Sequence, residues 1–320
     1  MPTLLTVDIG GTNCRFARFS IEKGALTLAG TARRQTADIP DTQALMDACA
    51  EALIAPGEAD ALVIGMAGPI AGQRRARLTN APLELDLSDA ETRYGVGACL
   101  LVNDFLAEAC ACLTPIGAGA FPVLGPRDAA TGDGTIGIIG AGTGLGTASL
   151  VRDSRGAWLP LPAEGGHAAF PFTGKEEADF QAFAASALGL SYLRGDDVLT
   201  GRGLCLLHAF LTGERREAAE VAAQGLSRET ETLRWYARFY GRACRDWALS
   251  TLCTGGLFIT GGIARRNPLV MRCASFRESF YDSPQRSLLE RLPVRRYADE
   301  ASGLWGSAWL AARLIGALPA

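Results

Sequence analysis

Residues 4–13 read LLTVDIGGTN, and this stretch decides the fold. Residues 4–9 form an apolar run that predicts a short buried strand, and Gly10-Gly11 predicts a tight turn after it. Residues 13–20 then alternate apolar and charged side chains, so we expect a second strand that returns beside the first. Backbone N–H groups in a glycine turn can converge on an anion because no side chain blocks its approach. The opening of the chain therefore predicts strand, turn and strand around a candidate phosphate site.

The same pattern occurs again further along the chain. Residues 136–146 read IGIIGAGTGLG, where a short apolar strand reaches a Gly-Thr turn and another strand follows at 147–151. Residues 255–262 read GGLFITGG, an apolar strand that ends at Gly261-Gly262. Any single turn of this kind is more often an ordinary connection between two strands, with no ligand. Because three such turns each follow a short apolar strand, they favour phosphate binding, and the repeated Gly-Thr turn predicts an internal duplication.

Around these turns, strand and helix patterns alternate. A segment with apolar residues at helical spacing follows Asp41, a residue type that favours the N-cap position. Such alternation predicts an α/β fold with parallel strands. The expected helices lie at 41–54, 105–113, 215–254 and 303–316, and the expected further strands at 60–67, 98–102 and 257–260.

Composition limits the functional classes. With 320 residues, 48% of them apolar and 20% charged, the chain is globular, and a net charge of −3 gives no basic footprint for nucleic acid. The longest uncharged stretches, 109–126 and 134–151, are broken by Gly and Pro, so we expect no membrane span. The nine cysteines include no Cys-x-x-Cys pair and no signal-peptide pattern is present, which predicts reduced thiols in the cytoplasm. With two histidines, a zinc cluster is not expected.

Two common nucleotide motifs are excluded. A P-loop requires Gly-Lys followed by Ser or Thr, whereas Gly174-Lys175 is followed by Glu176. The dinucleotide-binding fingerprint opens a helix, whereas residues 140–146 open a strand. The sequence therefore predicts neither a P-loop kinase nor a nicotinamide dehydrogenase.

Taken together, the motifs resemble those of the actin/hexokinase/sugar-kinase superfamily and, within it, the bacterial glucokinase family, over residues 4 to about 315. The three glycine turns look like that family's first phosphate, second phosphate and adenosine motifs. Asn103-Asp104-Phe105 resembles its catalytic segment. Residues 164–167, Glu-Gly-Gly-His, resemble its sugar-binding segment, and residues 199–203, Leu-Thr-Gly-Arg-Gly, resemble its glycine turn.

The resemblance implies a fold, domains and an activity. The fold is the two-lobe actin-like ATPase (ribonuclease H-like) α/β fold, with duplicated lobes and an ATP/sugar cleft between them. We expect an N-terminal lobe at 1–110, on which the C-terminal helix 301–320 packs back, and a C-terminal lobe at 111–300. The implied reaction is phosphorylation of glucose to glucose 6-phosphate by ATP with Mg²⁺, feeding glycolysis in the cytoplasm. Glucose and ATP are the expected partners, nucleic acid and membrane are not, and a homodimer is left open.

Phosphoryl transfer needs an aligned acceptor, a base and charge neutralisation. The resemblance implies that Asp104 is the base that accepts the proton of the sugar 6-hydroxyl. The alternative is that Asp104 caps a helix at 105–113. Sugar hydroxyls would be bound by Asn103, Asp104, Glu164 and His167, although an isolated histidine is more often buried and bonded to the backbone. The expected nucleotide-binding residues are Asp8, Ile9, Gly10, Gly11, Thr12, Asn13, Gly142, Thr143, Gly144, Gly261 and Gly262.

Asp8 is also the expected residue on the metal side, through water, because Mg²⁺ keeps several waters. The alternative for Asp8 is a turn-forming aspartate before glycines. No lysine is obviously placed as a phosphate clamp, and we expect Arg15 and Arg18 to be solvated.

Two positions depart from the family pattern. Asp196, followed by Asp197, stands where family members carry a glutamate that completes the sugar site. Leu83 stands where they often show a tryptophan, just after the Thr-Asn at 79–80. Because the shorter Asp196 would sit back from the sugar or reach it through water, a kinase of another hexose or of an amino sugar remains an alternative.

Two rival classes are less favoured. Repressor-like sugar-binding regulators place a helix-turn-helix domain ahead of the first phosphate motif, which here begins at residue 8. Related kinases with a structural zinc carry a cysteine cluster beside the sugar histidine, and no such cluster follows His167.

Overall fold

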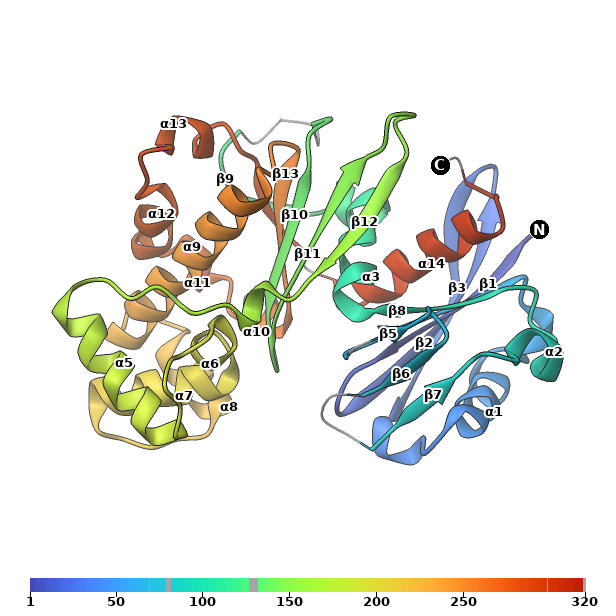
Figure 1. Ribbon diagram of the computed structural model, residues 1–320, viewed down its shortest axis with the longest axis horizontal. Coiled ribbons are helices and arrows are strands. Elements are labelled where there is room, and N and C mark those ends of the chain that lie inside the picture. Colours follow the sequence, from blue (N-terminus) through green and yellow to red (C-terminus); the bar gives the residue numbers. More distant parts are fainter. Residues whose placement is uncertain (69, 79–81, 127–131, 298, 319–320) are drawn as a thin grey trace. The chain divides into compact units, whose positions relative to one another are not determined.

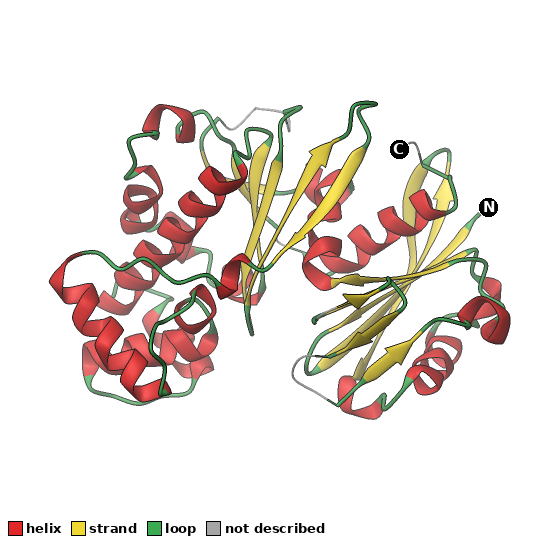
Figure 2. Cartoon of the chain, in the orientation of Figure 1, coloured by secondary structure: helices red, strands yellow, loops and turns green. Residues whose placement is uncertain are grey.

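The computed structural model describes residues 1–68, 70–78, 82–126, 132–297 and 299–318 (Figure 1). Contacts divide the chain into two compact units, each with helices packed against a sheet (Figure 2). The first comprises Met1–Gly119, Arg152–Pro162 and Asp299–Ala320, and the second comprises Ala120–Val151 and Ala163–Ala298. The first unit thus extends to Gly119 and also includes Arg152–Pro162, whereas the expected boundary between the lobes lies at residue 110. No helix among the described residues has both the length and the apolar character needed to cross a membrane.

The sheet of the first unit includes the two strands on either side of the opening glycine turn. β1 (Thr3–Ile9) pairs antiparallel with β2 (Asn13–Glu22), which confirms the predicted strand, turn and strand. On its other side β1 pairs in parallel with β4 (Ala61–Met66), and β4 pairs in parallel with β8 (Cys99–Asn103). With β3 (Ala25–Gln35) at the other edge, the strand order is β3-β2-β1-β4-β8. The carboxyl ends of β1, β4 and β8 therefore meet at one edge, where α/β sheets place their ligand groups.

Helices of the first unit cover this sheet. α1 (Thr42–Ala52) begins after Asp41, whose side chain accepts a hydrogen bond from the Ala44 N–H, as the N-cap prediction required. α14 (Ser302–Leu314) lies against β1, β4 and α3 (Asp104–Cys110), and Figure 1 shows it beside α3. The remaining elements are η1 (Thr36–Asp38), η2 (Pro56–Glu58), β5 (Ile70–Ala71), β6 (Arg75–Arg77), β7 (Glu84–Asp86), α2 (Ala90–Tyr94), η3 (Ala111–Leu113) and α4 (Pro115–Ala118).

The second sheet repeats this arrangement, as the duplicated glycine turns predicted. β10 (Ile136–Ala141) pairs antiparallel with β11 (Leu145–Arg152) and in parallel with β13 (Gly256–Thr260). The full order is β12-β11-β10-β13-β14-β9, with β12 (Trp158–Ala163), β14 (Val294–Arg296) and β9 (Phe121–Leu124) completing it.

The helices of the second unit form most of its core. The expected long helical region at 215–254 contains two helices, α8 (Ala218–Gly225) and α9 (Glu231–Thr251), rather than one. The physical reason is a new cap, because the Thr230 side chain accepts a hydrogen bond from the Leu233 N–H and starts α9 afresh. The others are η4 (Gly165–His167), α5 (Gly174–Leu188), α6 (Gly195–Val198), α7 (Gly201–Thr212), α10 (Gly262–Arg266), α11 (Leu269–Arg272), α12 (Ala274–Tyr281) and α13 (Arg286–Leu289).

Candidate active site

The first glycine turn connects β1 to β2. The Gly10 N–H donates to the Asn13 carbonyl at 2.9 Å, which closes the turn, and the Thr36 hydroxyl donates to the Gly10 carbonyl at 2.7 Å. Gly11 and Thr12 lie exposed at its tip. The turn is thus held from within the first unit while its tip stays accessible, as an anion site requires.

Asp8 lies against the start of α14. Its Oδ2 is 3.5 Å from Nη1 of Arg15, the residue directly opposite it on β2, and Arg15 also donates to the Glu300 carbonyl at 2.9 Å. A Cβ built on Gly303 would come within 3.4 Å of the Asp8 carboxyl carbon. The prediction that Arg15 is merely solvated is therefore wrong, since its guanidinium links Asp8 to the chain just before α14.

Asp104 is the first residue of α3, directly after β8. The N-cap of this helix is Asn103, whose Oδ1 accepts from the Phe105 N–H at 2.9 Å. The alternative of Asp104 as the cap is therefore wrong, although its Oδ1 also lies 3.0 Å from the same N–H. The pKa of Asp104 is raised to about 7, mainly by burial and in addition by the negative charge of Asp8. A carboxyl group with such a pKa can act as a general base near neutral pH.

The second glycine turn connects β10 to β11. Its Gly142 N–H donates to the Gly144 carbonyl at 2.9 Å. Ala141 and Leu145 are paired at its base, yet their N–H groups donate to side chains outside the hairpin. The Ala141 N–H donates to Tyr240 Oη at 3.2 Å, and the Leu145 N–H donates to Asp196 Oδ1 at 2.6 Å. Side chains from two other segments therefore hold the base of this turn.

The third glycine turn follows β13. Gly261 has φ +88°, and a Cβ at this position would overlap the Ala141 carbonyl oxygen, so glycine is required for both reasons. Gly262 then begins α10, and the Arg266 Nε donates to the Gly262 carbonyl at 3.1 Å. Within the second unit, the second and third glycine turns therefore meet at Ala141.

Glu164 directly precedes η4 and His167 is its last residue. Both side chains are exposed, so the alternative of a buried His167 is wrong. The His167 Nε2 lies 3.6 Å from Glu164 Oε2, and its Nδ1 lies 3.3 Å from Arg194 Nη1. Because arginine only donates, Nδ1 acts as the acceptor and a neutral ring carries its proton on Nε2, on the side of Glu164. This segment thus presents a carboxylate acceptor and an imidazole N–H donor to solvent.

Asp196 joins η4 to the second glycine turn. Beyond its bond to Leu145, its Oδ1 lies 3.0 Å from the position that a Cβ on Gly166 would occupy, and 3.4 Å from that of a Cβ on Gly144. Asp196 was expected at the sugar segment alone. The structure shows that one of its carboxylate oxygens is already bound to Leu145, at the base of the second glycine turn.

Asp197, the residue after Asp196, forms ion pairs with two arginines, and neither pair was predicted. Asp197 is buried and bonds Arg194 at 2.8 Å and Arg202 at 2.6 Å, and the hydrogen bond from Arg194 holds its pKa below the usual range. The arginine three residues before Asp197 was the available sequence signal. Asp197 therefore orients Arg194, which in turn bonds His167.

The second departure from the family pattern lies elsewhere. Leu83 is buried in the core of the first unit, and its carbonyl accepts from the Leu78 N–H at 2.9 Å. The Thr-Asn at 79–80 lies outside the described residues. Leu83 thus serves packing within the first unit.

A metal at this site would have few protein ligands. Across the described parts of the chain, no group of three or more His, Cys, Asp or Glu side chains could hold a metal ion. Mg²⁺ does not need such a cage, because it is usually held by one or two carboxylates, substrate phosphates and water. The carboxylate of Asp8 beside the first glycine turn fits that kind of binding.

Comparison with known proteins gives a consistent family and fold. The family model described as Glucokinase matches residues 5–314. The glucokinase of Brucella suis biovar 1 (strain 1330) is 30% identical over 317 residues, covering 95% of this chain and 89% of that protein. The glucokinase of Chelativorans sp. (strain BNC1) is 31% identical over 320 residues, covering 95% and 90%.

Solved structures share the fold. A glucokinase from an Antarctic psychrotroph has a TM-score of 0.83 at 23% identity, covering 98% of this chain and 99% of that one. The glucokinase from Balamuthia mandrillaris, in complex with glucose, has a TM-score of 0.81 at 20% identity, covering 97% and 93%. These similarities confirm the predicted α/β fold of the actin-like ATPases.

Proposed function

Since the chain belongs to the glucokinase family, we propose that it is an enzyme that phosphorylates glucose at its 6-hydroxyl with ATP as the donor. The observation that carries this proposal is the position of Asp104, a carboxyl group with a pKa of about 7 at the carboxyl end of β8. We further propose that the reaction feeds glycolysis in the cytoplasm.

Asp104 acts as the general base. The sugar 6-oxygen attacks the γ-phosphorus of ATP, the bond from that phosphorus to the β–γ bridging oxygen breaks, and ADP leaves. The hydroxyl proton passes to the Asp104 carboxylate. A base with a pKa near the working pH is deprotonated often enough to act and still basic enough to take the proton.

Sugar binding uses groups that accept and donate. The Glu164 carboxylate accepts from a sugar hydroxyl, and the His167 Nε2–H donates to a neighbouring one, an arrangement supported by the bond from Arg194 to Nδ1. The Asn103 Oδ1 is engaged with the Phe105 N–H, so its amide NH₂ is the group proposed to donate to the sugar. Asp196 has one carboxylate oxygen bound to Leu145, which leaves the other as the proposed sugar contact.

The glycine turns bind the nucleotide. In the first unit the residues proposed are Asp8 through Asn13, and in the second Gly142, Thr143, Gly144, Gly261 and Gly262, whose backbone N–H groups suit phosphate oxygens. When bound, Mg²⁺ would neutralise charge on the phosphates, with Asp8 as its proposed contact through water. Asp8 is held in place by Arg15 and by the close approach of Gly303.

The alternative of another hexose or an amino sugar keeps one supporting observation. Asp196 is shorter than the glutamate expected from the family, and the Leu145 N–H draws its Oδ1 to within 2.6 Å. A carboxylate held back in this way constrains the sugar less at the position that it faces. The same site then accepts a wider range of sugars than glucose alone.

The test is a coupled assay of ADP release with ATP, Mg²⁺ and a panel of hexoses and amino sugars. We expect the highest kcat/KM with glucose, and product analysis should find the phosphate on the 6-oxygen. A higher kcat/KM for another sugar would replace glucose by that substrate, and no transfer to any sugar would refute the proposed activity.

A further inference from the structure

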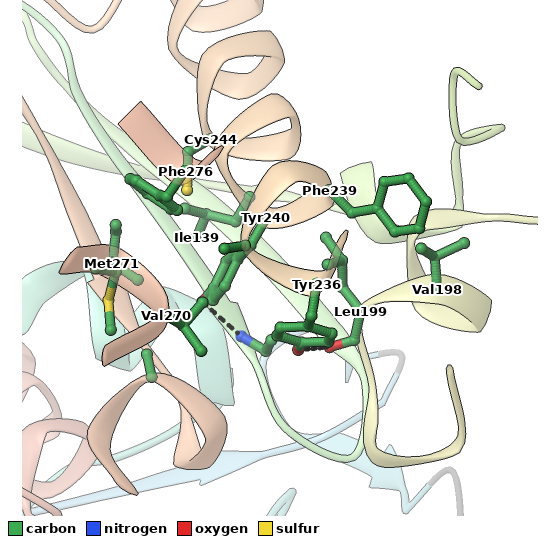
Figure 3. Packing of buried hydrophobic residues seen from close by; sticks show 14 of the residues in the cluster. Ile139, Val198, Leu199, Tyr236, Phe239, Tyr240, Cys244, Val270, Met271 and Phe276 are labelled. Carbon is green, nitrogen blue, oxygen red and sulfur yellow. Dashed lines mark hydrogen bonds between the residues drawn. The ribbon is translucent and has the colours of Figure 1, made fainter. Parts of the chain in front are cut away.

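The hydroxyl of Tyr240 lies between the two nucleotide motifs of the second unit. Tyr240 belongs to α9 and is completely buried, with its ring among those of the core (Figure 3). Its Oη accepts a hydrogen bond from the Ala141 N–H at 3.2 Å and donates to the Thr260 carbonyl at 3.4 Å. Ala141 directly precedes the second glycine turn, and Thr260 directly precedes Gly261.

This hydroxyl connects β10 and β13 at the point where their backbone pairing ends. The parallel pairing of these strands ends at Gly140 and Thr260, because Gly261 then turns away with φ +88°. The Ala141 N–H bonds away from its partner Leu145 in the β10–β11 hairpin. A buried N–H without an acceptor is costly, and Tyr240 supplies the acceptor at this point.

We propose that Tyr240 is a positioning residue for the nucleotide, which holds the second phosphate turn in register with the adenosine motif. The inference rests on the proposed function, since it assigns both turns to one ATP molecule. A turn that is already held in its binding conformation loses less entropy when the nucleotide binds. The Tyr240 hydroxyl should therefore increase the affinity for the nucleotide without contacting its phosphates.

The hydroxyl is well suited to a permanent structural role. Burial raises the pKa of Tyr240 well above the ordinary range, so the proton donated to Thr260 stays in place at any working pH. The ring packs edge-on against Tyr236 and Phe276, with centroids 6.2 Å away in each case. Phenylalanine would keep these contacts and remove only the oxygen.

The test is Tyr240→Phe, with binding of a non-hydrolysable ATP analogue measured by calorimetry without sugar. Loss of a hydrogen bond at the turn predicts an increase in the dissociation constant of about three- to tenfold. The KM for ATP should rise with it, while the KM for glucose stays within about twofold, since the Tyr240 hydroxyl bonds Ala141 and Thr260 and, among the described residues, neither η4 nor α6. Amide hydrogen exchange at Ala141 should become faster in the variant.

Tyr236→Phe is the matched control. Tyr236 lies one turn earlier on α9, is also completely buried, and donates to the Leu199 carbonyl at 2.8 Å, which belongs to neither nucleotide turn. It should lose similar thermal stability and keep its affinity for the analogue. The inference is overturned if Tyr240→Phe binds the analogue as wild type does, or if both variants weaken binding equally. A wild-type protein without affinity for the analogue would instead refute the proposed function, and this inference with it.

Discussion

At the scale of single residues, the proposed chemistry depends on the charge of Asp104. Asp104→Asn keeps the size of the side chain and removes the proton acceptor. A positioned general base typically contributes about 10²–10⁴-fold, so we expect kcat to fall by about that factor. The KM for glucose should change little, because an amide still bonds a hydroxyl. Steady-state kinetics measure both, and turnover within a few-fold of wild type would remove Asp104 from the base role.

The pKa of Asp104 predicts how activity depends on pH. Only the deprotonated carboxyl acts as the base, so kcat/KM should rise with pH through about 7 and then level off. Glu108 contributes to the raised pKa, so Glu108→Gln should move this rise to lower pH. Glu220→Gln, at an exposed site in the second unit, is the control and should leave the profile in place. A Glu108→Gln profile shifted upward would contradict this electrostatic account.

The same group also affects folding stability. Its pKa is raised from 3.8 to about 7 in the folded protein, so the folded state keeps a proton that the unfolded chain loses between these values. The stability contributed by Asp104 is therefore fully present below pH 4 and is lost as the pH rises through about 7.

Asp196 should affect both substrates. Asp196→Glu places the carboxylate further out, which favours the sugar but weakens the 2.6 Å bond to Leu145. We expect a lower KM for glucose and a higher KM for ATP, each by up to about tenfold, the range of a hydrogen bond to a charged group. Asp196→Ala should raise both constants. If the alanine variant behaves as wild type, Asp196 contributes to neither site.

At the scale of elements, α14 depends on a close approach to α3. A Cβ on Gly306 would overlap the Ala107 carbonyl oxygen of α3. Helix propensity alone favours alanine over glycine by about 1 kcal/mol, so a net loss of stability would come from this overlap. We expect Gly306→Ala to lower the free energy of unfolding by about 1–3 kcal/mol in a denaturant titration.

The next residue provides the control for that substitution. The Ser307 hydroxyl is buried and has no hydrogen-bond partner among the described residues. Ser307→Ala removes this unsatisfied group, so it should leave stability unchanged or increase it. A Gly306→Ala variant as stable as Ser307→Ala would show that the two helices can separate at little cost.

At the scale of the whole molecule, each unit has its own core, and the first is completed by the end of the chain. α14 covers β1 and β4, two strands that precede it by some 240–300 residues in the sequence. A chain that ends at Tyr297 should therefore leave these strands uncovered, while the core of the second unit stays intact. Hydrogen exchange should be faster in β1 and β4 and unchanged in β13. A chain that lacks only residues 317–320, beyond α14, is the control, and slow exchange in β1 of the shorter chain would refute the prediction.

Local sequence patterns determined much of this fold. The apolar runs and glycine turns around Asp8, Gly142 and Gly261 predicted strands and turns because each is set by neighbouring residues, through burial and backbone freedom. The Asp41 cap was predicted correctly for the same reason. The position of Asp104 after a strand also follows from sequence order. Its proposed role as a base came from the family resemblance.

Only the tertiary structure decided the partners of these groups. The bond from Leu145 to Asp196 spans 51 positions and that from Ala141 to Tyr240 spans 99, so no local pattern predicts them. Arg15 was expected in solvent, yet the fold brings the start of α14 to its guanidinium. The pKa of Asp104 likewise depends on burial by distant segments. Local propensity selects strands and turns, whereas long-range packing decides which charges and hydrogen-bonding groups meet.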